Sequence, residues 1–171
     1  MKLLELAKRF VLISAFGLWL GGFTVYTAFV IPIGHRHFPD RQFGFLTGEV
    51  TTVLGILSAA ATMLALVNMA LDWTRLEAGG RWASLATLLL LLGALLSVFI
   101  VHAKLDALLD YHARRISDPA LFEPLHERYE LFATIQWAAG LLHLGCLLAG
   151  WRRVDVKSGF QKVETAVSPM K

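Results

Sequence analysis

The feature that most constrains this chain is the placement of its charges, which leaves four long stretches with none. The charge-free stretches are residues 10–33, 50–71, 82–103 and 131–151. Each holds 21 to 24 residues, and about 20 residues of helix, rising ~1.5 Å each, cross a ~30 Å hydrocarbon core. One such stretch is compatible with a buried helix of a soluble protein. Four in a chain of 171 residues predict four membrane-spanning helices.

Composition supports the same fold class. The apolar fraction is 56% and the charged fraction is 17%, whereas soluble domains average roughly 45–50% and about 25%. The first stretch is too long for the apolar core of a cleavable signal peptide, so we expect it to remain as a helix. The sequence therefore predicts an all-α, integral membrane, up-down-up-down four-helix bundle formed by residues 1–151.

The distribution of basic residues predicts the orientation of this bundle. With four spans, both tails and the 72–81 loop share one side of the membrane, and that side holds ten of the sixteen lysines and arginines. Basic residues favour the cytoplasmic side. We therefore expect a multi-pass protein of the plasma (inner) membrane with both termini in the cytoplasm. The high pI of about 9.2 then reflects topology, and we expect no nucleic-acid partner.

The segments outside the spans carry further expectations. Residues 34–48 are expected to form a loop. Beyond His102, apolar residues at helical spacing predict that the third helix projects past the membrane as far as Ile116. Asp118 and Pro119 have the chemistry of a cap and a first helical residue, so a lead-in helix, interrupted at Pro124, is expected before the fourth span. Residues 152–171 are basic and polar, and we expect a disordered cytoplasmic tail.

Several short motifs occur at a characteristic spacing. They are Leu-Trp-Leu-Gly-Gly-Phe at 18–23, Val-Ile-Pro at 30–32, Phe-Gly at 43–44, Thr-Gly at 47–48 and Leu-His at 125–126. This set resembles the family related to transmembrane protein 205, and the resemblance covers roughly residues 10–148. It implies a small four-helix membrane fold and brings no reaction with it, because that family's domain has no established function. His35, Glu49 and Tyr129 depart from the family pattern, so no shared role is carried over to them.

Histidines and carboxylates gather on the side opposite the tails. The candidate metal ligands there are His35, Glu49, His102, Asp106, His126 and Glu130. His102 with Asp106, and His126 with Glu130, are four residues apart and so share a helix face. A divalent metal needs such groups to converge from several elements, and a haem near this rim is a further possibility. The alternative is that they are solvated residues, since no strict metal signature such as H-E-x-x-H occurs.

Gln136 and His143 lie inside the fourth charge-free stretch, where polar side chains are costly unless paired. His143 is twelve residues past Leu131, or about 18 Å from that end. The same depth on the other helices falls near Gly21, Thr62 and Leu91, so a haem held by two core histidines has no second ligand. Each polar residue has two interpretations, an interhelical hydrogen bond or the lining of a substrate path.

The functional expectation follows from these features. There is no phosphate-binding glycine loop, no G-x-S-x-G motif and no CxxC pair, and Cys146 stands alone. The leading hypothesis is a non-catalytic accessory, scaffold or permeation-related membrane component. The alternative is a metal- or haem-binding redox component using the histidine and carboxylate residues above, and a small transporter is a third hypothesis. The expected partners are the lipid bilayer and either a second copy of the chain or another membrane protein.

Overall fold

The computed structural model describes residues 3–110, 113 and 115–167, with side chains except those of 40–42 and 158–167, and most of this chain is helix. In chain order the elements are α1 (Leu3–Val25), the π-helical turn η1 (Tyr26–Val30), α2 (Ile31–His37), α3 (Asp40–Asp72), α4 (Ala78–Asp106), β1 (Leu109–Asp110), β2 (Arg115–Ile116) and α5 (Pro119–Val167). Within the described residues, four helical segments are long and apolar enough to cross a membrane: Leu3–His37, Phe43–Asp72, Ala78–Asp106 and Pro119–Lys157. A mostly helical fold with four helices long and apolar enough to span a membrane is therefore confirmed.

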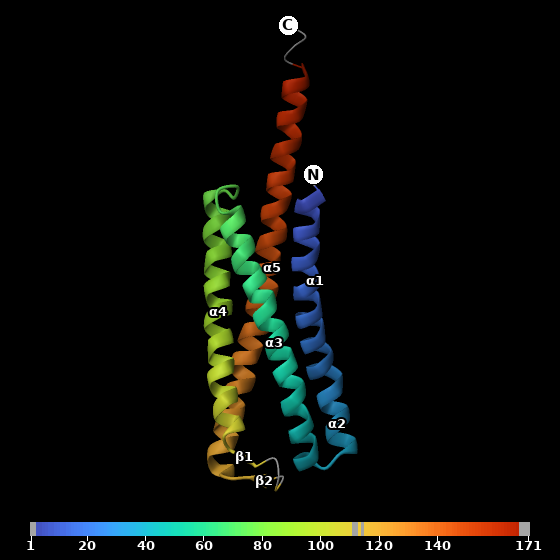
Figure 1. Cartoon of the computed structure of the whole chain (residues 1–171), viewed down its shortest axis with the longest axis vertical. Coiled ribbons are helices and arrows are strands. Elements are labelled where there is room, and N and C mark those ends of the chain that lie inside the picture. The colour runs from blue at the N-terminus through green and yellow to red at the C-terminus, as the bar shows by residue number, and fades with distance from the viewer. Residues whose placement is uncertain (1–2, 111–112, 114, 168–171) are drawn as a thin grey trace.

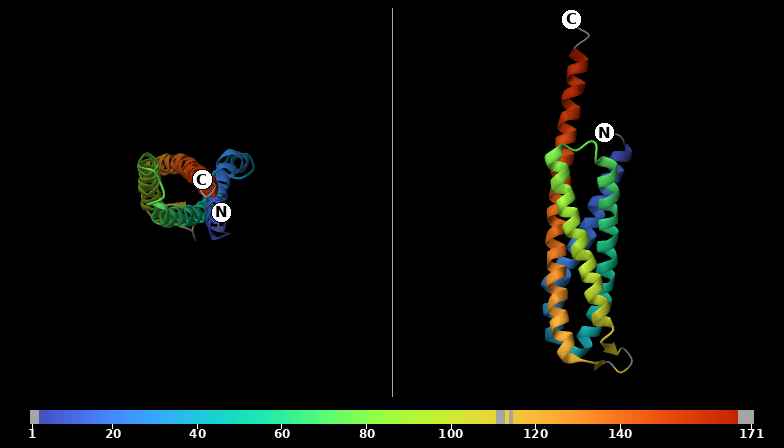
Figure 2. Two further views of the ribbon diagram at one scale, coloured as in Figure 1. Left: turned by 90° about the horizontal axis from the view of Figure 1, so that it is seen from above. Right: turned by 90° about the vertical axis from the view of Figure 1, so that its left-hand side faces the viewer.

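The long helices lie side by side around a common interior. Seen from above, α1, α3, α4 and α5 form a closed ring, in which each helix contacts the two beside it (Figure 2). The start of α1 and the turn between α3 and α4 lie at one end, and α5 extends beyond it (Figure 1). We call this the basic end, after Lys8, Arg9, Arg75, Arg81 and Arg152. The opposite end carries β1, β2 and the junction of α2 with α3, and we call it the histidine end, after His35, His102 and His126 (Figure 1).

The interior of the ring is packed with large side chains from some helices against small ones from others. Phe16 and Trp19 of α1 are almost fully buried, as are Ala61 and Ala65 of α3 and Ala139 of α5. Small residues let helix backbones approach closely where lipid provides no hydrophobic drive between helices. The outward faces carry exposed large apolar residues, among them Leu89, Leu96, Ile100 and Leu142. Such a surface suits contact with lipid.

The first helix is longer than the sequence predicts. Pro32 was expected near its end, but the helical path continues through η1 and α2 to His37. Within η1 the spacing widens, and the N–H of Ile31 donates to the carbonyl of Tyr26. A π turn of this kind accommodates a residue that cannot complete the normal helical ladder, as Pro32 cannot. The expected 34–48 loop is reduced to Phe38 and Pro39.

The prediction that the third helix continues to Ile116 is wrong. Helix α4 ends at Asp106, and Leu109 pairs with Ile116 across the short antiparallel ladder of β1 and β2. The side chain of Asp110 accepts a hydrogen bond from the N–H of Ala113 at 2.9 Å, which stabilises the chain reversal. Leu109 and Ile116 are seven residues apart, a spacing that fits one face of a helix and also a cross-strand pair. The hydrogen bond of Asp110 within the turn favours the cross-strand pair.

The start of α5 agrees with the sequence, but its end does not. Asp118 Oδ1 accepts a hydrogen bond from the N–H of Leu121 at 3.1 Å, and Pro119 is the first helical residue. The helix then continues through Pro124 without interruption and on to Val167. Most of the 152–171 segment expected to be disordered is thus helical. It has no proline before Pro169, and ion pairs of Asp155 and Lys157 attach its first turns to the bundle.

Candidate functional site

The richest polar arrangement at the histidine end is centred on His102. Its Nδ1 lies 3.0 Å from Oδ2 of Asp106, one helical turn further along α4. Its Nε2 lies 3.4 Å from Oγ1 of Thr51 on α3. Thr51 also hydrogen-bonds with Tyr129 of α5, whose ring centroid lies 5.7 Å from that of His102. Side chains from three helices therefore meet here.

The helical segment made of α1, η1 and α2 adds Tyr26 to this arrangement. Tyr26 belongs to η1, is buried, and hydrogen-bonds with Thr47 of α3, one turn before Thr51. Single π turns often accompany functional positions because they redirect a side chain. We call Tyr26, Thr51, His102, Asp106 and Tyr129 the His102 cluster. The sequence singled out the pair of His102 with Asp106. That the hydroxyl groups of Tyr26, Thr51 and Tyr129 meet this pair could not be predicted, because no characteristic spacing of Thr and Tyr indicates such a contact.

The other predicted metal ligands lie apart from this cluster. His126 Nδ1 is 3.6 Å from Oε1 of Glu130, and both side chains are largely exposed. His126 stacks on Phe122, while His35 contacts the ring of Phe43 at 5.1 Å between centroids. Glu49 is exposed at the start of the second charge-free stretch. The expected six-residue convergence is not formed.

A metal centre needs about three or four converging ligands. Within the part of the chain that the structure describes, no three His, Cys, Asp or Glu side chains are close enough to hold one ion. Both ring nitrogens of His102 already face a protein partner. The described donor groups therefore do not fit a divalent metal. His112, on the same side in the sequence, lies outside the described residues.

His143 is enclosed inside the bundle. Its side chain is fully buried, its Nδ1 lies 2.9 Å from Oγ1 of Thr87, and its ring stacks on Phe16. Among the described residues, its Nε2 has no hydrogen-bond partner. The sequence predicted Gly21, Thr62 and Leu91 at the depth of His143, whereas its contacts on α1 and α4 are Phe16 and Thr87. The helices extend unequally beyond the charge-free stretches, so counting from their ends misaligned them by about one turn.

Gln136 also turns toward the interior. Its Nε2 donates to Oγ of Ser58 at 3.2 Å, and both residues are buried. The indole N–H of the next residue, Trp137, donates to Oγ1 of Thr24 at 3.1 Å. These contacts connect α5 to α3 and to α1. Gln136 and His143 thus both make contacts between helices, which was one of the two interpretations open from sequence.

Charged side chains join the helices at the basic end. Asp72, buried at the end of α3, accepts two hydrogen bonds of 2.9 Å from Nζ of Lys8 and lies 3.4 Å from Nη1 of Arg75. Arg9 donates to both carboxylate oxygens of Asp155, at 2.7 and 3.1 Å. The sequence located these charges at one end of the bundle and could not pair them.

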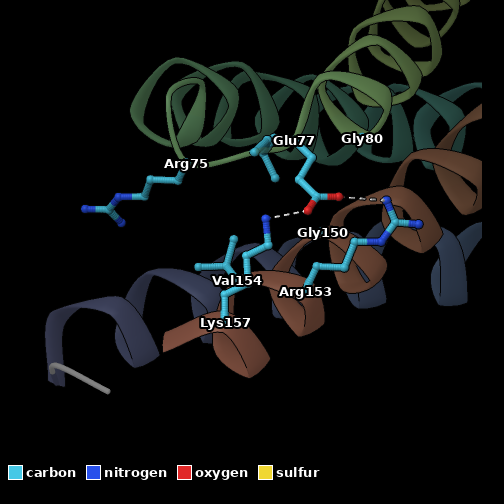
Figure 3. Close-up of a pocket in the computed structure, with 8 residues that line it drawn as sticks. Arg75, Glu77, Gly80, Gly150, Arg153, Val154 and Lys157 are labelled. Atoms are coloured by element: carbon cyan, nitrogen blue, oxygen red, sulfur yellow. Dashed lines mark ion pairs between the residues drawn. The ribbon is translucent and has the colours of Figure 1, made fainter. Parts of the chain in front are cut away.

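A second ion-pair group holds the turn between α3 and α4 against α5. The carboxylate of Glu77 lies between Lys157 and Arg153, beside Gly80 and Gly150 (Figure 3). The hydrogen bond from Lys157 holds the pKa of the Glu77 carboxyl below its usual value. The pocket among these residues measures about 20 Å³, room for about one water molecule. It is therefore a structural contact with no space for a substrate.

Replacing Thr51 by valine tests whether the His102 cluster holds helices together. Thr51 and Thr52 both donate to the carbonyl of Gly48, at 2.9 and 3.0 Å, but only Thr51 also meets His102 and Tyr129. We expect Thr51→Val to lower the free energy of unfolding by about 1 kcal/mol more than Thr52→Val, because it removes the contact of α3 with two partly buried polar side chains, His102 and Tyr129. Denaturation by SDS in mixed micelles measures both. Equal losses would mean that the cluster makes no contribution between helices.

Comparison with known proteins adds a family to this description. A family model described as a domain of unknown function, DUF4149, matches residues 14–110. The match covers more than half of the chain and runs from the middle of α1 through η1, α2, α3 and α4 to the end of β1. The chain belongs to this uncharacterised family. No curated protein and no solved structure matches it, and the relationship to transmembrane protein 205 suggested by the motifs stays a prediction.

Proposed function

We propose that this protein is a non-catalytic component of the plasma membrane, acting as an accessory or scaffold subunit. Its four long helices cross the bilayer up-down-up-down, with the basic end in the cytoplasm and the histidine end on the other side. The excess of lysine and arginine at the basic end supports this orientation. The expected partner is a second copy or another membrane protein.

One observation carries the proposal against a permeation role. The interior polar residues that could line a path are used to join helices to one another, Gln136 with Ser58 and His143 with Thr87. Phe16 and Leu91, both fully buried, pack in the same interior. A path through a single bundle would require these contacts to break. The lipid-facing apolar surface is free for contact with a partner helix.

One observation favours the metal-binding alternative: the side chains of His102 and Asp106 lie side by side. In that alternative His126, Glu130, Glu49 and His35 would have to approach this pair. The exposed positions of His126 and Glu130 at present support solvated ion pairing instead.

A single preparation tests these functions against one another. The full chain is purified without chelator, analysed for metal and visible absorption, and reconstituted into planar bilayers. We expect no stoichiometric metal, no haem band and no conductance above that of bare lipid.

Two outcomes would contradict the proposal. A metal or chromophore lost in the double variant His102→Ala, His126→Ala, but kept in a His37→Ala control, would establish the cofactor alternative. His37 serves as the control because it is exposed at the end of α2 and is not among the candidate ligands. A conductance altered by Gln136→Leu would establish a permeation path.

A further inference from the structure

Helices α1 and α5 lie side by side at the basic end of the bundle (Figure 1). An open groove runs along the surface between them. It has a volume of about 550 Å³, within the range of small-molecule sites. Phe10 and Ile13 of α1 form one wall, Leu148 of α5 forms the other, and all three are about half exposed or more. Trp151 is buried and forms part of the lining.

The groove crosses the expected boundary of the membrane. Phe10 is the first residue of one charge-free stretch, and Trp151 is the last residue of another. Ile13 and Leu148 therefore lie on the hydrocarbon side of this boundary. A tryptophan at such a level is typical of the interface between acyl chains and headgroups. In a bilayer, an outward-facing apolar groove at this depth is filled by the acyl chain of a lipid.

Charged residues line the same groove at the headgroup level. Arg9 is held by Asp155, and its guanidinium lies over the ring of Trp151 at 5.1 Å from the centroid. Arg9 and Asp155 neutralise one another. Arg152, the second arginine of the groove, is exposed, and no carboxylate among the described residues forms an ion pair with it. Arg9 is paired with both Asp155 and Glu5, so among the described residues Arg152 carries the positive charge that is left beside the apolar channel.

We propose that this groove is a binding site for an anionic phospholipid, with one acyl chain along Phe10, Ile13 and Leu148 and the phosphate-bearing headgroup at Arg152. Basic residues between helices at the membrane boundary recognise anionic headgroups in this way. The site belongs to the leaflet on the side of the basic end.

The test measures lipid competition on the full chain by native mass spectrometry. The protein is released from detergent containing equal amounts of dioleoyl phosphatidylglycerol and dioleoyl phosphatidylcholine. We expect wild-type protein to retain the anionic lipid preferentially. Arg152→Gln should reduce the ratio of bound anionic to zwitterionic lipid about fivefold, the effect of one basic group near a lipid headgroup.

Arg153→Gln is the matched control, since Arg153 is the next residue of α5 but lies 3.9 Å from Glu77, outside the groove. It should leave the ratio unchanged. An unchanged ratio in Arg152→Gln, or an equal fall in both variants, would overturn the proposal, the latter in favour of diffuse surface charge. Displacement of the lipid by millimolar inorganic phosphate would also overturn it, because the ligand would then be phosphate alone.

Phe10→Ala tests the apolar wall separately from the charge. It should lower the retention of both lipids and leave their ratio unchanged, because the alanine shortens the surface that contacts the acyl chain. Undiminished retention would mean that the acyl chain does not lie in the groove. Both side chains are exposed, so circular dichroism should show unchanged helix content in Arg152→Gln and Phe10→Ala.

Discussion

Replacing Gly140 by alanine is expected to lower the free energy of unfolding by about 1–3 kcal/mol, through overpacking of the core. A Cβ atom at this position would lie 2.6 and 2.8 Å from two ring carbons of Trp19, and 3.1 Å from Cδ2 of Leu20. Trp19 is only 2% exposed and cannot turn away. The clash therefore has to be relieved by separating α5 from α1. SDS denaturation followed by circular dichroism measures the loss.

Gly145 on the same helix provides the control. A Cβ atom there would meet nothing within 4 Å, and the residue is exposed. Both substitutions gain the same helix propensity, up to about 1 kcal/mol in water. We therefore expect Gly145→Ala to be neutral or stabilising and Gly140→Ala to be destabilising. A destabilisation of equal size in both would contradict the close contact between Gly140 and Trp19.

The second large effect is expected at Asp72. Asp72→Asn should lower the free energy of unfolding by about 2–3 kcal/mol, because it breaks a poorly solvated ion pair and leaves Lys8 with Glu5, 3.0 Å away, as its carboxylate partner. The side chain of Asp72 is 6% exposed and that of Lys8 is 20% exposed. The same SDS titration measures this loss, and the start of α1 should become the first part of the bundle to exchange its amide hydrogens.

An exposed ion pair at the same end serves for comparison. Glu77 is 47% exposed where it meets Lys157. Exposed pairs contribute little, so Glu77→Gln should lower the free energy of unfolding much less than Asp72→Asn does. The double variant Lys8→Met, Asp72→Leu should recover most of the stability lost in Asp72→Asn, since it removes both charges together. If Asp72→Asn proves no worse than Glu77→Gln, the pair of Lys8 with Asp72 does not attach α1 to α3.

The helical character of the chain was predictable because charge is so costly in lipid. An uncharged stretch of more than twenty residues leaves few alternatives to a spanning helix, since every backbone polar group must be satisfied within the segment. The helix start at Pro119 was predictable for a local reason, the capping chemistry of Asp118. The pair of His102 with Asp106 was predictable because four residues on a helix bring side chains to one face.

The remaining details depended on contacts between elements distant in sequence. Whether Leu109 and Ile116 lie on a helix or face one another across a ladder depends on the turn between them. Pro32 ended the predicted helix because the sequence gives no sign of the π turn that accommodates it. The depth of His143 relative to Phe16 and Thr87 depends on how far each helix extends beyond its charge-free stretch, which charge counting cannot determine.

The sequence by itself determined that this protein is a membrane protein of four long apolar helices with its basic residues concentrated at one end. The reason is that lipid excludes charge and unpaired backbone groups wherever the chain crosses it. Only the tertiary structure decided which polar groups meet: Thr51 and Tyr129 at His102, Ser58 at Gln136, and Lys8 at Asp72. These contacts depend on the rotation and axial position of each helix relative to its neighbours. Packing between residues distant in sequence determines that rotation and position, and local sequence does not.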